Sequence, residues 1–334
     1  MSTNKEIVVS GIRPTGKLHL GNYFGAVVNF LKLQETHDCY FFIADYHSLT
    51  THPDSKNLKQ SIRHIMAEYL AMGLDPEKCA LYIQSDLPET TELYLLLNMF
   101  AYKGELERVS TFKEKIKSQP NNVNAGLLTY PALMAADILI HRADLVPVGR
   151  DQEQHLEMTR DFAQRFNHIY KDEVLPLPQA FSFGDQLVKV PGLTAQGKMS
   201  KSNSEKDAIY FTDEPKILRK KIMSAVTDSG PTEPNSKPSE GVQNIFELMR
   251  LVSNADVIEK FKKAHADCTI RYGDLKGQLA DDVEQFVAPF REKIDYYYNN
   301  PEILNKVALS GQTKAKASAR KTLDLVRGAA GLGL

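Results

Sequence analysis

Residues 7–22, with the sequence IVVSGIRPTGKLHLGN, indicate the fold more clearly than any other part of the chain. The three apolar residues at its start are β-branched, which predicts a short buried strand. Pro14 and the glycines that follow predict a loop whose backbone can approach a ligand closely. A helix is then expected from near Gly21 to Phe30. Its N-terminus would present free N–H groups and a positive dipole end, which suit a phosphate group.

Further apolar runs repeat this alternation of strand and helix. Strands are expected at residues 39–45 (CYFFIAD), 81–84 and 145–148, with helices between them such as residues 58–72 and 91–99. The pattern predicts an α/β fold with a Rossmann-like parallel sheet and helices on both of its faces. Ligands of such sheets bind at the carboxyl ends of the strands, so the residues after each strand are candidates for a site.

Clear strand patterns end near Asp213, and helical periodicity follows, for example over residues 242–251 and 280–298. Residues 228–241 are rich in Pro, Ser and Gly and are expected to form a surface loop. We therefore expect two domains. Residues 1–205 would form the Rossmann-like catalytic domain, and residues 206–334 an all-helical C-terminal domain.

Composition excludes several classes of protein. The 334 residues carry a formal net charge of -1, so any nucleic-acid binding must use a local basic patch. Three widely separated cysteines predict neither a disulfide framework nor a zinc site and fit a cytoplasmic protein. No apolar stretch approaches the roughly 20 residues that span a bilayer, and the polar N-terminus does not resemble a signal peptide.

Two segments carry side chains suited to phosphate chemistry. In the first, His19 can donate a hydrogen bond to a phosphate oxygen, and Asn22 can donate one without a charge. The second, residues 197–202 (GKMSKS), is expected to be a loop after a strand at residues 187–190. Lys198 and Lys201 could neutralise the charge that builds on a departing pyrophosphate, while serine hydroxyls and loop N–H groups add hydrogen bonds. Either segment alone is also typical of an ordinary surface loop.

Together, in this order, the two segments resemble the HIGH and KMSKS signatures of the class I aminoacyl-tRNA synthetases. The resemblance implies activation of an amino acid by ATP, with Mg²⁺ held mainly by phosphate oxygens and water and with no tightly bound cofactor. It implies catalytic roles for His19, Asn22, Lys198 and Lys201. The ATP-binding residues that it implies are Arg13, Pro14, Thr15, Gly21, Asn22, Gly149, Arg150, Asp151, Val190, Lys198, Met199, Ser200, Lys201 and Ser202.

Three of these positions depart from the family pattern. Asn22 replaces the last His of the first signature, Arg13 stands where relatives often have Gln, and Arg150 replaces a commoner acidic residue.

The amino-acid substrate is expected to meet the segment 127–151, where Pro131 would suit the first turn of a helix that runs on through residues 132–139. Tyr130, Met134 and Asp137 are spaced i, i+4 and i+7 and so share one face. A buried carboxylate must be hydrogen-bonded or neutralised. Asp137 could accept a hydrogen bond from an indole N–H, or it could simply pair with Arg142 or Lys103.

Residues 127–139 (LLTYPALMAADIL) and 145–167 (LVPVGRDQEQHLEMTRDFAQRFN) resemble the tryptophanyl-tRNA synthetase family. In that family the Asp of the MAAD turn reads the indole nitrogen. Tyrosyl-tRNA synthetases have a similar plan but carry Gln where Met134 stands, and a thioether suits an indole better than a phenol. The resemblance implies a tryptophan site made of Asp137, Tyr130, Met134, His47 and Gln152.

The same resemblance implies the partners. The enzyme would use L-tryptophan, ATP and tRNA(Trp), would form a homodimer, and would work in the cytoplasm. The helical domain would bind the anticodon, and basic residues of the C-terminal helix could contact tRNA phosphates. These are Lys314, Lys316, Arg320, Lys321 and Arg327. Two alternatives remain open at this point: a tyrosyl-tRNA synthetase-like enzyme, and a tRNA- or nucleotide-binding paralogue that does not aminoacylate.

Overall fold

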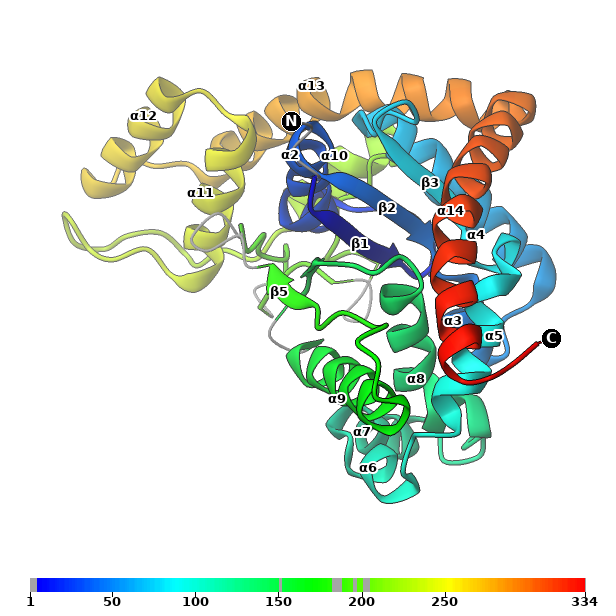
Figure 1. The fold of residues 1–334 in the computed structure, drawn as a ribbon. Helices are drawn as coiled ribbons and strands as arrows, with labels where there is room; N and C mark the ends of the chain where they lie inside the picture. Colours follow the sequence, from blue (N-terminus) through cyan, green and yellow to red (C-terminus); the bar gives the residue numbers. More distant parts are fainter. Residues whose placement is uncertain (1–4, 150–151, 182–187, 195–196, 201–204, 334) are drawn as a thin grey trace.

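The computed structural model describes residues 5–149, 152–181, 188–194, 197–200 and 205–333. Its centre is a parallel sheet of five strands in the order β3-β2-β1-β4-β5 (Figure 1). The strands are β1 (Ile7–Ile12), β2 (Asp38–Ile43), β3 (Cys79–Ile83), β4 (Leu145–Pro147) and β5 (Gln179–Phe181). The predicted parallel, Rossmann-like sheet is confirmed. The strand expected at residues 187–190 is wrong for residues 188–190, which are not in a strand; Leu187 lies outside the described residues.

Side chains alternate between the two faces of the sheet, and each face has its own core. Val8, Phe41 and Leu81 belong to one buried cluster, which also includes side chains of the C-terminal helices as far as Leu304. Val9, Phe42 and Tyr82 belong to the other. Helices between the strands supply much of both clusters, as expected for a sheet covered on both sides. They are α2 (Val28–Thr36), α4 (Ser55–Met72), α5 (Pro88–Asn98), α6 (Lys103–Arg108), α7 (Ser110–Ser118), α8 (Ala125–Leu139) and α9 (Glu153–Tyr170).

The helix after β1 is longer than the sequence pattern predicts. It starts as α1 (Leu20–Asn22), continues through a π-helical turn (Tyr23–Val27) and runs on as α2 to Thr36 rather than ending at Phe30. Another short helix, α3 (Asp45–Ser48), begins directly after β2. Both short helices therefore begin at the carboxyl edge of the sheet, where ligands of this fold bind.

Five more α-helices follow β5 in the described residues: α10 (Pro215–Met223), α11 (Glu240–Val252), α12 (Ala255–Ala266), α13 (Tyr272–Asn299) and α14 (Pro301–Ala329). In Figure 1, α11 and α12 form a lobe to the left of the sheet. The long helix α13 packs along α4, and α14 packs along β3. Ala315, Ala319 and Leu323 of α14 lie in the same buried cluster as Tyr82 of β3. The last helix therefore returns to the sheet, whereas the boundary at residue 205 stays a prediction.

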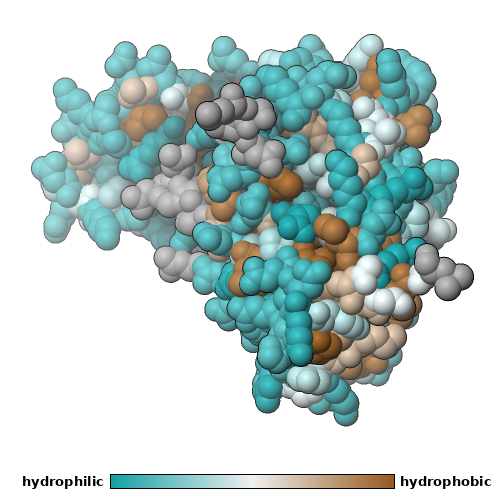
Figure 2. All heavy atoms as spheres, in the orientation of Figure 1, coloured by the Kyte–Doolittle hydropathy of each residue, from teal (hydrophilic) through white to brown (hydrophobic). Residues whose placement is uncertain are grey.

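The face shown in Figure 2 is mostly hydrophilic, with apolar side chains confined to smaller patches. Among the helices that the structure describes, none combines the length and apolarity needed to cross a membrane.

Candidate active site

A cavity of about 370 Å³ lies at the carboxyl ends of β1 and β4. Gly11 and Arg13 line it where β1 ends, and Val148 and Gly149 line it just after β4. The chain order of the sheet reverses between these two strands, so their connections diverge and leave a crevice. The fold therefore places the cavity where open parallel sheets bind their ligands.

Helix α8 supplies one wall. Tyr130, Met134 and Asp137 all line the cavity, as their shared helical face predicts. The helix begins at Ala125, with the side chain of Asn124 accepting a hydrogen bond from the N–H of Leu127. Pro131 consequently lies inside the helix, so its expected place in the first turn is wrong.

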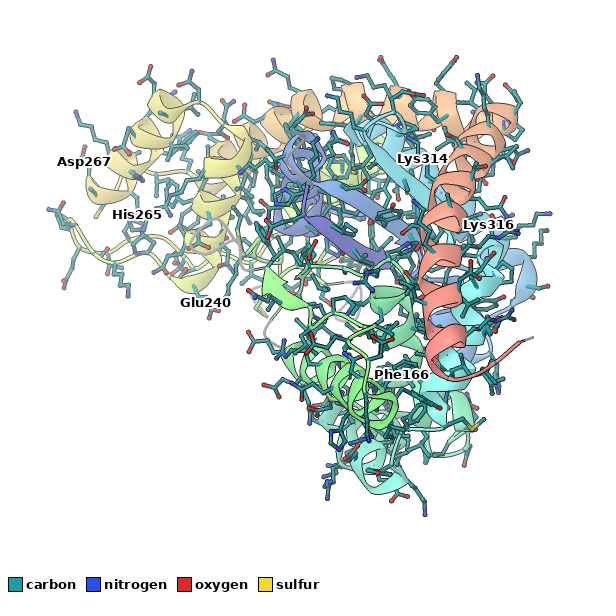
Figure 3. All side chains as sticks on the ribbon, viewed as in Figure 1. Phe166, Glu240, His265, Asp267, Lys314 and Lys316 are labelled. Atoms are coloured by element: carbon teal, nitrogen blue, oxygen red, sulfur yellow. The ribbon has the colours of Figure 1, made fainter. Side chains whose placement is uncertain are left out.

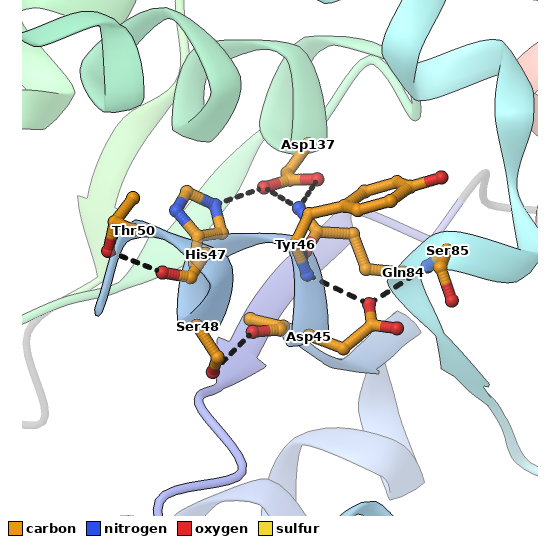
Figure 4. A network of polar contacts seen from close by, with 9 residues as sticks. Asp45, Tyr46, His47, Ser48, Thr50, Gln84, Ser85 and Asp137 are labelled. Atoms are coloured by element: carbon orange, nitrogen blue, oxygen red, sulfur yellow. Dashed lines mark hydrogen bonds and ion pairs between the residues drawn. The ribbon is translucent and has the colours of Figure 1, made fainter. Parts of the chain in front are cut away.

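Asp137 is 2% exposed and is held by two side chains from other elements (Figure 4). Its Oδ2 lies 2.8 Å from Nε2 of His47, and Nε2 of Gln84 donates to both carboxylate oxygens at 2.8 and 2.9 Å. Gln84 is fixed in turn because its Oε1 accepts a hydrogen bond from the N–H of Tyr46 at 3.1 Å. Burial raises the pKa of the Asp137 carboxyl, and the hydrogen bond with His47 opposes that rise.

The alternative partners considered for Asp137 are wrong. Arg142 donates to the backbone oxygen of Val174, and Lys103 pairs with Glu107 at 3.4 Å. The carboxylate instead faces an apolar cavity that includes Met134, with hydrogen bonds that fix its orientation. Because a carboxylate can accept about four hydrogen bonds, it retains capacity for an N–H donor from a ligand.

Tyr130 is also positioned by polar contacts. Its hydroxyl meets the hydroxyl of Thr111 and the Nε2 of His155, both of which line the cavity. Burial raises the pKa of Tyr130, so the phenol stays neutral at physiological pH. The ring of Tyr130 can therefore present an apolar face to a ligand, because its hydroxyl is held by Thr111 and His155.

His19 and Asn22 hold each other at the start of α1. The Nδ1 of His19 accepts from the N–H of Asn22 at 3.3 Å, and the Asn22 Oδ1 accepts from the N–H of His19 at 3.1 Å. A Cβ on Gly21 would lie 2.9 Å from the His19 ring, so glycine is required for this close approach. Just before His19, the N–H of Leu18 donates to both oxygens of the buried Glu68, at 3.0 and 3.1 Å. The sequence pattern gave no indication of this anchor.

Residues 190–192 pair with residues 197–199 beside α1, and these two stretches are called the lysine hairpin below. Pro191 pairs with Lys198 in an antiparallel bridge, and the N–H of Met199 donates to the Val190 oxygen at 2.8 Å. The Cβ of Met199 lies 3.5 Å from where a Cβ on Gly21 would stand. The two signature segments, far apart in sequence, are therefore adjacent, with Lys198 exposed. The backbone oxygen of Val190, a predicted ATP-binding residue, therefore already accepts a hydrogen bond within the hairpin.

The remaining predicted residues fall into three groups. Arg13, His47, Gly149 and Gln152 line the cavity, and burial lowers the pKa of Arg13. Pro14, Thr15 and Gly21 follow β1 outside the cavity lining; Met199 is buried in the lysine hairpin, and Ser200, directly after it, is half-buried. Arg150, Asp151, Lys201 and Ser202 lie outside the described residues.

Two functional groups are not among the sequence-predicted residues: Gln84, which holds Asp137 from outside the cavity lining, and Lys115, which lines the cavity. Gln84 directly follows the apolar strand β3, and a polar residue at that point is the signal that could have found it. Lys115 of α7 lines the cavity and brings a cation to the wall that carries Thr111. Its only sequence signal is a basic run, which is more often a solvated helix face. No group of three or more His, Cys, Asp or Glu side chains suited to a metal ion occurs within the described part of the chain.

The chain is similar to known proteins over most of its length. Residues 1–288 match the family described as tRNA synthetases class I (W and Y). The chain is 56% identical over 322 residues to the tryptophan–tRNA ligase of Porphyromonas gingivalis, covering 96% of this chain and 98% of that relative. A tryptophanyl-tRNA synthetase from Campylobacter jejuni, solved in complex with ADP and tryptophan, superposes with a TM-score of 0.89 at 34% identity, covering 98% and 100%.

Fold, site and comparisons define the class: the chain belongs to the class I tRNA synthetases. A tyrosyl-tRNA synthetase from Aeropyrum pernix has a TM-score of 0.64 at 18% identity, covering 97% of this chain and 90% of that one, and shares the fold alone. The 56% identity to the Porphyromonas gingivalis relative distinguishes the tryptophanyl from the tyrosyl members of this class. Within the class, the chain is a member of the bacterial-type tryptophanyl-tRNA synthetase family.

Proposed function

We propose that the chain is a tryptophan–tRNA ligase. It activates L-tryptophan with ATP to give tryptophanyl-adenylate and diphosphate, and then transfers the tryptophanyl group to the 3′ end of tRNA(Trp). The observation that carries the proposal is the buried Asp137, oriented by His47 and Gln84 in an otherwise largely apolar cavity at the strand ends. Such a carboxylate suits an apolar ring that carries one N–H donor.

Activation requires no protein nucleophile, because the carboxylate of the amino acid attacks the α-phosphate of ATP directly. Mg²⁺ enters with ATP as part of that substrate. His19, Asn22 and the N-terminus of α1 stabilise charge near the α-phosphate, and Lys198 with Lys201 neutralises the departing diphosphate. Arg13 and Lys115, which line the cavity, add positive charge near the phosphates.

Selectivity for tryptophan would come from the cost of leaving Asp137 without a ligand N–H. Phenylalanine is also aromatic and apolar, but its ring is smaller and carries no N–H donor, so the buried carboxylate would lose one hydrogen bond. Met134 and Tyr130 pack on the indole ring. Gly149 and Gln152 lie across the cavity, where they can contact the α-amino group or the ribose.

The test is amino-acid-dependent exchange of labelled diphosphate into ATP, with L-tryptophan, L-tyrosine or no amino acid. We expect exchange with tryptophan only. Exchange with tyrosine would support a tyrosyl-specific enzyme, and no exchange would support a paralogue without aminoacylation. Because the chain contains no tryptophan, the fluorescence of the ligand itself reports its binding and provides an independent measurement.

For tRNA binding, the lobe of α11 and α12 is a better candidate than α14. Cations of α14 pair with acids of α5: Arg320 with Glu89 at 3.2 Å, and Arg327 with Glu92 at 2.6 Å. Lys314 donates to the backbone oxygen of Pro76. Figure 3 shows Lys314 and Lys316 on α14, at the opposite side of the view from His265 on α12. A second cavity, of about 460 Å³, lies in the lobe and includes Lys237, Arg250, Lys262 and His265 in its lining.

We also propose a homodimer that works in the cytoplasm. Three large apolar side chains on α5 and just after it are exposed: Leu95, Met99 at 70%, and Tyr102. Apolar side chains gathered on one element favour contact with a partner. A second copy of the chain is the partner that the family resemblance implies, and sedimentation analysis of the purified protein tests it.

A further inference from the structure

Asp207 is a buried carboxylate at the base of the lysine hairpin, with an exposed fraction of 0%. Its Oδ1 accepts a hydrogen bond from the N–H of Thr194 at 2.9 Å and another from the hydroxyl of Thr194 at 2.6 Å. The backbone oxygen of Asp207 accepts from the N–H of Leu193 at 3.2 Å. A Cβ on Gly192 would lie 2.3 Å from Oδ1, so the carboxylate occupies the space of the missing side chain.

The residues directly after Asp207 pair with the histidine segment. The N–H of Leu20 donates to the Ile209 oxygen at 3.0 Å, and the N–H of Phe211 donates to the Leu18 oxygen at 3.3 Å. His19 and Tyr210 form the antiparallel bridge between these two pairs. One short stretch of backbone, residues 207–211, therefore contacts the histidine segment directly and residues 193–194, next to the strand that pairs with the lysine segment.

Asp207 also holds residues 193 and 194, which follow the stretch that pairs with Lys198. Gly192 donates its N–H to the Gly197 oxygen at 3.0 Å, and Pro191 is bridged to Lys198. The N–H of Val226 donates to the Leu193 oxygen at 3.0 Å, which adds a second anchor from outside the hairpin. A shift of residues 192–194 would therefore move Lys198 relative to His19.

We propose that Asp207, acting through Thr194, is a positioning residue for the activation step. Its carboxylate sets the distance between Lys198 and His19, the two groups that must stabilise charge on one triphosphate. The inference rests on the proposed function. Misplacement of catalytic groups by about 1 Å can cost about 100-fold in rate. The hydrogen bonds between Asp207 and Thr194 can therefore affect turnover although neither residue lines the cavity at the carboxyl ends of β1 and β4.

The experiment compares four variants with the wild-type protein. Asp207→Ala removes the clamp. Thr194→Val removes only the hydroxyl while keeping the shape, and Thr194→Ser keeps the hydroxyl. Asp144→Ala is the matched control, because Asp144 likewise accepts a backbone N–H, that of Ile7 at 2.8 Å, but lies at the other end of β1. Each protein is measured for kcat in tryptophan-dependent diphosphate exchange, for the Kd of tryptophan by ligand fluorescence, and for its melting temperature.

We expect Asp207→Ala to lower kcat by at least about tenfold and to leave the Kd of tryptophan within about twofold. Thr194→Val should also lower kcat. Thr194→Ser and Asp144→Ala should keep kcat near the wild-type value. An unchanged kcat in Asp207→Ala, or a parallel loss of tryptophan binding, would overturn the inference. If Asp207→Ala does not fold, equal kcat values for Thr194→Val and Thr194→Ser overturn it. Wild-type protein without tryptophan-dependent exchange would instead refute the proposed function.

Discussion

A single buried carboxylate illustrates how function opposes stability at the scale of one residue. Asp137 lies in an apolar environment that penalises its ionised form, and its pKa is raised mainly for that reason. His47 and Gln84 reduce the penalty by hydrogen bonding, without removing it. A fold with no ligand to recognise would gain stability from a neutral residue at this position.

The substitution Asp137→Asn tests both sides of this conflict. We expect the KM for tryptophan to rise by at least about tenfold in diphosphate exchange, because Asn places a donor where the indole and Gln84 need acceptors. The fold should be retained. Stability is measured by urea unfolding over a series of pH values, for the wild-type protein and the variant.

The sign of the pH dependence follows from the raised pKa. Below the ordinary pKa of the carboxyl, Asp137 is protonated in both states, and its contribution to stability is fully present. That contribution is lost as pH rises through the raised pKa of the folded protein. The unfolding free energy of the wild-type protein, relative to Asp137→Asn, should therefore fall over that window. A relative rise over the same window would contradict the assigned burial, and an unchanged KM would remove Asp137 from the tryptophan site.

At the scale of elements, the sequence predicts those strands and helices whose conformation depends mainly on interactions between neighbouring residues. The strand–loop–helix unit of residues 7–22 and the shared face of Tyr130, Met134 and Asp137 follow from composition and periodicity, and the structure has both. The short strand β5 has only three residues and little burial, so its pairing with β4 decides its conformation. Gln84 reaches Asp137 and Lys115 reaches the cavity from other elements, and only the tertiary fold brings them there.

The close packing of α14 on β3 yields a prediction for that helix. A Cβ on Gly311 would lie 1.9 Å from the backbone oxygen of Leu81, an atom of β3 that cannot move without distorting the sheet. Gly311→Ala should therefore lower the unfolding free energy by about 1–3 kcal/mol in urea titrations. Gly328→Ala is the control on the same helix, because nothing lies within 4 Å of its Cβ position. That change should be neutral or stabilising by up to about 1 kcal/mol. Equal effects at the two positions would show that α14 does not pack on β3 in solution.

At the scale of the whole molecule, positive and negative side chains nearly balance, with 41 Lys and Arg against 42 Asp and Glu. A net charge of -1 gives no general attraction to tRNA, so local cations must supply it. Cations of α14 are engaged by Glu89 and Glu92 of α5. The cavity in the lobe of α11 and α12 has Lys237 and Arg250 in its lining beside the ring of Phe246, while Lys262 of the same lining pairs with Glu259 at 2.6 Å. Cations beside an aromatic ring are the combination that binds unpaired nucleotides.

The salt dependence of tRNA binding distinguishes the two surfaces. Arg250→Ala and Arg327→Ala each remove one arginine from a helix, so they change the net charge equally. We expect Arg250→Ala to weaken binding of tRNA(Trp) by about 3- to 10-fold and to reduce the slope of log K against log salt by about 0.7–0.9, the value for one lost phosphate contact. Arg327→Ala should leave both quantities near wild type, because its guanidinium already serves Glu92 at 2.6 Å. Filter binding at several salt concentrations measures both. The reverse result, with the slope reduced only by Arg327→Ala, would place the tRNA along α14 and remove the lobe as its binding surface.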